Sequence, residues 1–144
     1  MKKRLMGIDY GDVRTGLAVS DALGILASGI GTVTARGKHA LLAHIVSESE
    51  TYGIDEYVVG NPINMNGTVG ERSEKAQRFA KFLAESTGKP VHLFDERCTT
   101  MAAHQILNIT ETRGKKRKEV VDTLSAQIIL QNYIDSHQSE LDKK

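Results

Sequence analysis

The stretch RLMGIDYGDVRTGLAVS, residues 4–20, predicts two buried strands joined by a tight turn. Residues 4–10 are short and apolar and stop at Gly11, and residues 15–20 form a second apolar run. Because the connection is short, the two strands should pair antiparallel. A less regular strand at residues 26–35 would complete an antiparallel three-strand meander.

The spacing of the apolar residues changes after this third strand and becomes helical in several segments. We expect a helix at about 38–52 closed by Gly53, followed by a strand at 56–60. The next helix should begin after a capping box of Thr68 and Glu71 and end at Gly88 and Pro90, and a strand at 91–95 should follow it. The rest of the chain should form a helix at roughly 100–109, a loop at 110–117 and a last helix from about 118 to 136.

This order predicts an α/β domain built on a mixed five-stranded sheet. The antiparallel three-strand meander would be followed by parallel strands, with helices on both faces of the sheet. We expect one domain at residues 1–138 and a polar C-terminal tail at 139–144. In sheets of this kind, sites lie beyond the carboxyl ends of the parallel strands.

Composition narrows the class of protein further. The 144 residues carry a formal net charge of +1, so binding to nucleic acid would need a local positive patch. The single cysteine, Cys98, excludes an internal disulfide and fits a reducing compartment. We see no signal peptide and no apolar stretch long enough to span a bilayer, so we expect a cytoplasmic protein without a membrane partner.

Acidic residues stand at the ends of the predicted strands. Asp9 ends the first strand, Asp95 and Glu96 end the last strand, and Asp122 lies near the start of the last helix. A buried carboxylate is costly unless it is paired or bound to metal. Three such acids from three elements therefore predict a cluster that binds Mg²⁺, and this arrangement suits hydrolysis of phosphodiesters.

The sequence supports some of these acids as metal ligands more strongly than others. Asp95 and Glu96 should point to opposite faces of the strand, so only one is expected to be a direct ligand, and we favour Glu96. Asp122 is followed one turn later by the small residues Ser125 and Ala126, which would let its helix lie close to the sheet. For Asp122 alone, a solvated acid at a helix start is the more common explanation.

Several residues near these acids are candidates for substrate binding. Gly11 lacks a side chain, so a phosphate or metal could approach the backbone there. The loop at 60–67 is rich in backbone donors. Arg97 could bind a phosphate, although a structural salt bridge is equally compatible with its position. From these segments we expect Gly11, Asn61, Asn64 and Arg97 to bind substrate.

One dense basic run precedes the helix that carries Asp122. We expect Lys115, Lys116, Arg117 and Lys118 to clamp a nucleic-acid backbone there, although such runs are often solvated loops. Further basic residues recur along the helix that follows the predicted capping box and could extend this patch, but glutamates are interleaved with them. These basic residues are Arg72, Lys75, Arg78 and Lys81.

Four segments of the chain resemble the YqgF family: Ile8–Gly11, Val58–Thr68, Phe94–Thr100 and Val121–Ala126. Members of this family are described as pre-16S rRNA nucleases and are similar to Holliday junction resolvases. The resemblance covers nearly the whole chain and implies an RNase H-like fold.

The resemblance also implies a Mg²⁺- or Mn²⁺-dependent nuclease site, with Asp9, Glu96 (or Asp95) and Asp122 as catalytic acids. The expected role is cytoplasmic trimming of the 5′ end of the small-subunit ribosomal RNA precursor, with ribosomal particles as partners.

Three other functions remain open at this point. A junction-resolving DNA nuclease would use the same site, but paired cuts require a symmetric dimer, whereas we expect a monomer or a weak dimer. Residues 7–20 also resemble the phosphate-binding hairpin of the actin and sugar-kinase superfamily, which would make the chain an ATP-binding domain. A noncatalytic ribosome-assembly factor is the third alternative, and the intact acids argue against it.

Overall fold

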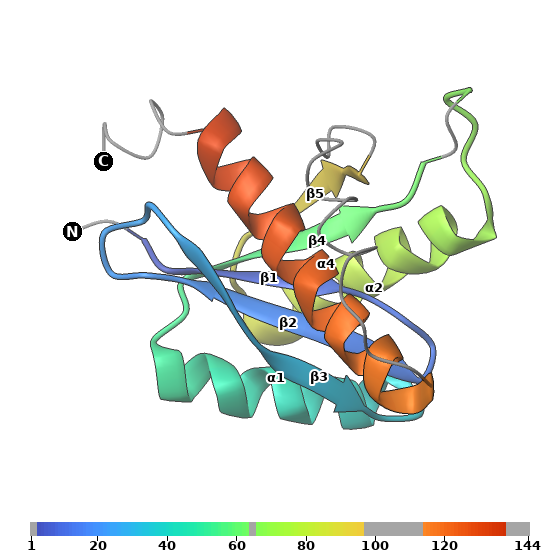
Figure 1. Cartoon of the computed structure of the whole chain (residues 1–144), viewed down its shortest axis with the longest axis horizontal. Coiled ribbons are helices and arrows are strands. Elements are labelled where there is room, and N and C mark those ends of the chain that lie inside the picture. Colours follow the sequence, from blue (N-terminus) through green and yellow to red (C-terminus); the bar gives the residue numbers. More distant parts are fainter. Residues whose placement is uncertain (1–2, 64–65, 97–113, 138–144) are drawn as a thin grey trace.

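The computed structural model of the chain describes residues 3–63, 66–96 and 114–137, and for residues 114–121 it describes the helical backbone only (Figure 1). A five-stranded sheet lies at the centre, in the order β3-β2-β1-β4-β5. Helices pack on both of its faces. No helix in these described ranges has the length and apolarity that crossing a bilayer would require.

The sheet is mixed, as predicted. β1 pairs antiparallel with β2, and β2 pairs antiparallel with β3, which forms the expected meander. β1 pairs parallel with β4, and β4 pairs parallel with β5. The five strands are β1 (Leu5–Asp9), β2 (Arg14–Ser20), β3 (Ala27–Thr34), β4 (Glu56–Asn61) and β5 (Val91–Asp95).

Two helices cover one face of the sheet and one long helix crosses the other (Figure 1). These are α1 (Lys38–Tyr52) and α2 (Glu71–Thr87) on the first face, and α4 (Gly114–Ser136) on the second. Each face therefore has its own apolar core, and the sheet separates the two cores.

Alternation along β1 decides which side chains reach which core. Met6 and Ile8 are fully buried in the core beneath α1 and α2. Leu5 belongs to the core beneath α4, and the Cα of Gly7 lies against Leu130 of that helix. The same alternation places Asp9, the last residue of β1, on the α4 side of the sheet.

Helix α4 can lie directly on the strands because three neighbouring strands each present a glycine to it. These are Gly7 on β1, Gly16 on β2 and Gly29 on β3, and a Cβ on any of them would overlap an atom of α4. A Cβ on Gly7 would also lie 2.9 Å from the backbone oxygen of the fully buried Ala126. The small residue at 126 and the glycines beneath α4 therefore bring the part of α4 from Asp122 to Leu130 close to the sheet.

The predicted capping box is wrong. Helix α2 begins at Glu71 with Gly70 at its N-cap, and no side chain caps it. The hydroxyl of Thr68 lies 2.7 Å from the side-chain oxygen of Asn66 and bonds there, in a turn that precedes the helix. The predicted helix ends at Gly53 and Gly88 are confirmed, since both glycines adopt the left-handed conformation.

The last helix begins earlier than predicted. Residues 114–117, expected as part of a loop, are helical, because lysine and arginine favour helix and only Gly114 opposes it. The predicted helix at 100–109, the rest of the loop at 110–113 and the tail at 139–144 lie outside the described residues.

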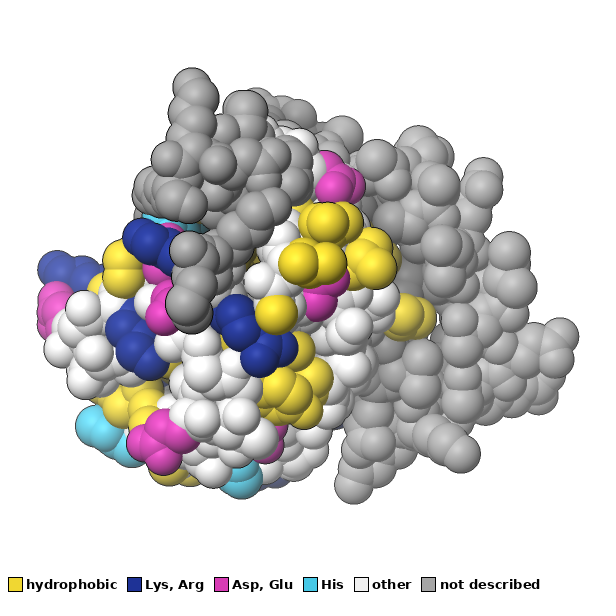
Figure 2. All heavy atoms as spheres, turned by 90° about the vertical axis from the view of Figure 1, so that its left-hand side faces the viewer, with side chains coloured by type: hydrophobic (Ala, Val, Ile, Leu, Met, Phe, Trp, Pro, Cys, Tyr) yellow, Lys and Arg dark blue, Asp and Glu magenta, His cyan; other side chains and the backbone are white. Residues whose placement is uncertain are grey.

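The turn between β2 and β3 carries exposed apolar side chains. Leu23, Ile25 and Leu26 are 64%, 47% and 60% exposed. Figure 2 shows hydrophobic side chains gathered between charged ones on this end of the molecule. This turn lies next to the start of β1, at the opposite end of the strand from Asp9, so it takes no part in a site built on that residue.

Candidate active site

Three of the predicted acids are brought to the same end of the sheet. β1, β4 and β5 run parallel, so Asp9 at the end of β1 and Glu96 directly after β5 lie together at the carboxyl end of these strands. Phe94 faces the core beneath α4, and Glu96 is two residues further on the same side. Gly60, the next-to-last residue of β4, lies on the strand between them, and a Cβ on it would lie 3.1 Å from the Glu96 carboxylate. Asp122 reaches this end of the sheet from α4.

Among these acids, Asp9 has the pKa that is raised furthest from its usual value. Burial raises the pKa of Asp9 from 3.8 to about 7, and the negative charges of Glu96 and Asp122 add to the effect. The guanidinium of Arg72 acts in the opposite direction. No hydrogen bond from a described residue offsets the burial. A carboxyl whose pKa is raised by burial and by neighbouring acids is in a site that favours a cation.

The Glu96 carboxyl responds to the same surroundings. Burial raises its pKa, while Arg72 lowers it and Asp95 raises it further. Glu96, and not Asp95, is among the charges that raise the pKa of Asp9. Asp95 follows Phe94 on the other face of β5. This arrangement supports Glu96 over Asp95 as the acid that belongs with Asp9.

Asp122 is engaged by an arginine. Arg14 Nε lies 3.1 Å from Asp122 Oδ2, and both side chains are partly exposed. Among the described side chains, no three acidic, histidine or cysteine groups already stand in a metal-binding arrangement. The acids are therefore near one another and electrostatically coupled, but Asp122 is held by Arg14.

Arg14 was not among the residues predicted from the sequence to form the site. The signal was present, because Arg14 begins β2, and β2 returns antiparallel beside the end of β1 that carries Asp9. Arg72 was considered only as part of a basic helix surface. Its effect on both Asp9 and Glu96 places it at the site instead.

A hollow of about 340 Å³ opens beside these groups, and we call it the active-site hollow. Two acids and two arginines line it together with the turn after β1: Asp9, Asp122, Arg14, Arg72 and residues 10–13. Gly11 is part of this lining, and its role in substrate binding stays a prediction. The turn also requires glycine at this position, since a Cβ there would lie 2.1 Å from the backbone oxygen of Arg14.

The structure separates Asn61 from this hollow. Its side chain is buried and accepts a hydrogen bond from the hydroxyl of Ser73 on α2. That contact lies on the opposite face of the sheet from Asp9, so we leave Asn61 out of the proposed substrate contacts. Asn64 and Arg97 lie outside the described residues, as do the side chains of the basic run 115–118.

The sheet order and its covering helices define an RNase H-like domain, and solved structures share this fold. The chain superimposes on Thermus thermophilus RuvC in complex with a Holliday junction substrate with a TM-score of 0.57, at 15% identity, covering 94% of this chain and 96% of that one. The yeast mitochondrial Holliday junction resolvase Ydc2 gives a TM-score of 0.54 at 11% identity, covering 99% and 81%. These likenesses establish the fold.

The particular family follows from sequence comparison. The family model RuvX, described as Holliday junction resolvase, matches residues 3–136. A relative from Geobacillus sp. (strain WCH70), named "Putative pre-16S rRNA nuclease", is 48% identical over 140 residues, covering 94% of this chain and 99% of the relative. One of the same name from Bacillus subtilis (strain 168) is 44% identical over 138 residues, covering 92% and 98%. The chain belongs to the RuvX family, which confirms the resemblance to YqgF.

Proposed function

We propose that this protein is a divalent-metal-dependent nuclease that hydrolyses phosphodiester bonds at the 5′ end of the pre-16S ribosomal RNA. The observation that carries the proposal is the partly buried Asp9 carboxyl at the active-site hollow, whose pKa is raised by desolvation and by the nearby Glu96 and Asp122. The names of the curated relatives support the choice of substrate. Ribosomal particles that contain this precursor, in the cytoplasm, are the partners we propose.

The acids suit a hard cation. Asp9 and Glu96 would hold Mg²⁺ or Mn²⁺, which prefer oxygen ligands, and Asp122 would join them when it leaves Arg14. A bound divalent cation would lower the pKa of a coordinated water and stabilise charge on the phosphate oxygens. The desolvation of Asp9, which Arg72 offsets only in part, is the structural reason to expect this cation.

The arginines at the active-site hollow would act on the substrate. Arg14 and Arg72 line the same hollow as Asp9 and Asp122, and both can donate paired hydrogen bonds to phosphate oxygens. Their charges would hold the scissile phosphate against the acids and offset the negative charge that the two groups bring together. Arg72 also lowers the pKa of Asp9 and Glu96, which favours the ionised forms that bind metal.

A Holliday junction in DNA is the second candidate substrate. The description of the RuvX family model and the solved RuvC complex with such a junction favour it. Resolution of a four-way junction requires two symmetric cuts and therefore a dimer. Our expectation of a monomer or a weak dimer accordingly places RNA first.

The test compares the two substrates directly. Purified protein is incubated with a 5′-extended pre-16S RNA fragment and with four-way junction DNA, in Mg²⁺, in Mn²⁺ or in chelator. We expect metal-dependent cleavage of the RNA, its loss in Asp9→Asn and its retention in Glu85→Gln, which removes an exposed acid elsewhere on α2. Cleavage of the junction alone would replace the first proposal by the second. A folded protein that cuts neither substrate would reject both.

A further inference from the structure

Two more hollows continue from the active-site hollow along α2. One measures about 230 Å³ and the other about 270 Å³, and both are lined by Tyr10, Asp12 and Lys75. The first also shares Arg72 and Gly11 with the active-site hollow. The three hollows therefore form one groove, which begins at Asp9 and passes the turn after β1; we call the two hollows beyond the active site the α2 groove.

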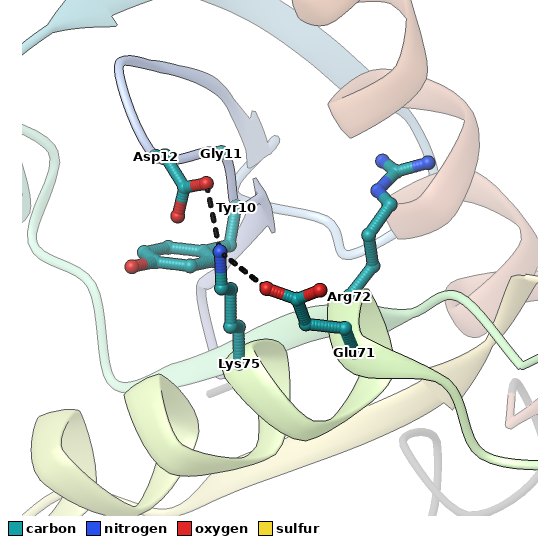
Figure 3. A pocket seen from close by; sticks show the side chains of 6 residues that line it. All are labelled: Tyr10, Gly11, Asp12, Glu71, Arg72 and Lys75. Carbon is teal, nitrogen blue, oxygen red and sulfur yellow. Dashed lines mark hydrogen bonds and ion pairs between the residues drawn. The ribbon is translucent and has the colours of Figure 1, made fainter.

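The α2 groove carries unneutralised positive charge. Lys75 adds no free positive charge, since its Nζ lies 3.0 Å from Asp12 and 3.3 Å from Glu71, two carboxylates against one ammonium (Figure 3). Arg72 and Arg78 are exposed and form an ion pair with no carboxylate in the described part of the chain. Lys38, at the start of α1, adds a further cation where the groove ends.

Aromatic rings form the floor between these cations. Tyr10 is partly exposed and stacks on the buried Phe79, with ring centroids 4.7 Å apart and planes at 17°. Further along, Lys38 Nζ lies 4.6 Å from the centre of the Phe82 ring. Figure 3 shows the Tyr10 ring beside the ion pairs of Lys75. A rigidly backed ring flanked by cations is the arrangement that binds unpaired nucleotides.

We propose that the α2 groove binds the unpaired strand of a nucleic-acid substrate as it leaves the active-site hollow; this inference rests on the proposed nuclease function. Arg78 and Lys38 contact phosphates along the strand, beyond the scissile phosphate that Arg72 holds in the active-site hollow. Tyr10 stacks against one of its bases. The proposal adds a strand-binding site, and with it a preference for single-stranded flanks, to the cleavage site at Asp9.

A single strand fits the groove better than a duplex does. In a duplex the base faces are stacked on each other, so a ring on the groove floor would have nothing to stack against. Residues 72 and 78 lie about 9 Å apart along the helix axis, which is long enough for their side chains to contact different phosphates. The groove therefore offers separate contacts to the backbone and to a base.

The first test measures charge recognition. Fluorescence anisotropy in chelator follows binding of a labelled oligouridylate of about 10 nucleotides over a range of salt concentrations. Lys38→Gln combined with Arg78→Gln should weaken binding and reduce the slope of log K against log salt by about 1.4. The control is Lys81→Gln, an exposed cation of α2 outside the groove, which should leave the slope unchanged. An unchanged slope in the double variant, or an equal decrease of the slope in the control, would overturn the proposal that the α2 groove binds the strand.

The second test measures stacking. Tyr10→Leu should weaken oligouridylate binding about tenfold, whereas Tyr10→Phe keeps the ring and should bind like the parent. A blunt RNA duplex of the same length should bind more weakly than the single strand and should not respond to Tyr10→Leu. Equal binding of both probes, or full affinity in Tyr10→Leu, would contradict a single-strand site.

A third measurement separates the groove from the nuclease. Asp9→Asn should lose hydrolysis of bis(p-nitrophenyl) phosphate in Mn²⁺ but keep the salt slope for oligouridylate, because Asp9 does not line the α2 groove. If the parent protein hydrolyses no phosphodiester but shows the predicted binding, the proposed nuclease function is rejected and strand binding in the α2 groove is retained. If the parent protein hydrolyses phosphodiesters but the variants do not change binding as predicted, only strand binding in the α2 groove is rejected.

Discussion

A Cβ on Gly16 would lie 1.9 Å from the backbone oxygen of Asp122, so β2 and α4 are in direct backbone contact at the candidate active site. The contact sets how deep the turn of α4 that carries Asp122 lies on the sheet. It thereby brings the Asp122 side chain within reach of Arg14 and of the Asp9 charge. Gly16 is thus a structural requirement for the site, although it lines no part of the hollow that Asp122 lines.

Gly16→Ala should separate α4 from β2 and displace Asp122. We expect a loss of about 1–3 kcal/mol in the free energy of unfolding, together with a large loss of nuclease activity. Gly29→Ala is the matched comparison and should cost less, because the nearest atom to its Cβ would be the Thr123 methyl, at 2.5 Å, and the nearest backbone atom would be 3.5 Å away. Thermal unfolding and cleavage assays measure both effects. Parent-like stability and activity in Gly16→Ala would show that the contact is dispensable.

Asp9→Asn should change how stability depends on pH in the metal-free protein. Folding raises the pKa of Asp9 from 3.8 to about 7, so the folded state binds the proton more tightly. Its contribution to stability is present at low pH and is lost as pH rises through 7. Between pH 5 and pH 8 the parent should lose about 2–3 kcal/mol that Asp9→Asn does not lose. Denaturant unfolding in chelator at both pH values measures this difference, and parallel curves would contradict it.

Divalent metal should reverse this loss in the parent protein. At pH 8, saturation with Mg²⁺ or Mn²⁺ at about 100 times the dissociation constant should add about 2.7 kcal/mol of stability. Asp9→Asn should lose most of this gain because it removes a charged ligand. Glu85→Gln, which alters an exposed acid of α2, should keep the gain. Equal stabilisation of all three proteins would place the metal elsewhere.

Arg14→Gln should separate metal binding from catalysis. The substitution breaks the 3.1 Å ion pair and releases Asp122, so less metal should be needed for half-maximal stabilisation. The turnover number should fall, because a phosphate contact in the active-site hollow is lost. Arg36→Gln, an exposed arginine outside that hollow, is the control. Weaker metal binding in Arg14→Gln would mean that Arg14 instead orients Asp122 for the metal.

Asn61→Ala should affect stability rather than substrate binding. The Asn61 side chain is buried and bonded to Ser73, which also accepts a hydrogen bond from Gln77 at 3.0 Å. Removing the amide should lower the free energy of unfolding by about 1–2 kcal/mol. The Michaelis constant for RNA should not change. A raised Michaelis constant at unchanged stability would return Asn61 to the substrate-binding residues.

The amino-acid sequence alone determined the elements and their order, because hydrophobic periodicity is a local property. Short apolar runs at residues 4–10 and 15–20, joined by a tight turn, together with the less regular run at 26–35, were enough to predict the meander. Asp9 could be identified in the same way, as an acid that ends a buried strand. The errors were also local: Thr68 bonds within its own turn, and residues 114–117 continue the last helix.

Only the tertiary structure decided how the site is arranged. The ion pair of Arg14 with Asp122 joins residues 108 positions apart, and the contact of Gly16 with the same helix has no local signature. Asn61 follows Gly60 in the chain but faces the other core, since successive side chains of a strand point to opposite sides. The charge on Asp9 likewise depends on burial beneath α4 and on acids from two other elements. Such relationships depend on packing between distant segments, which periodicity along the chain does not specify.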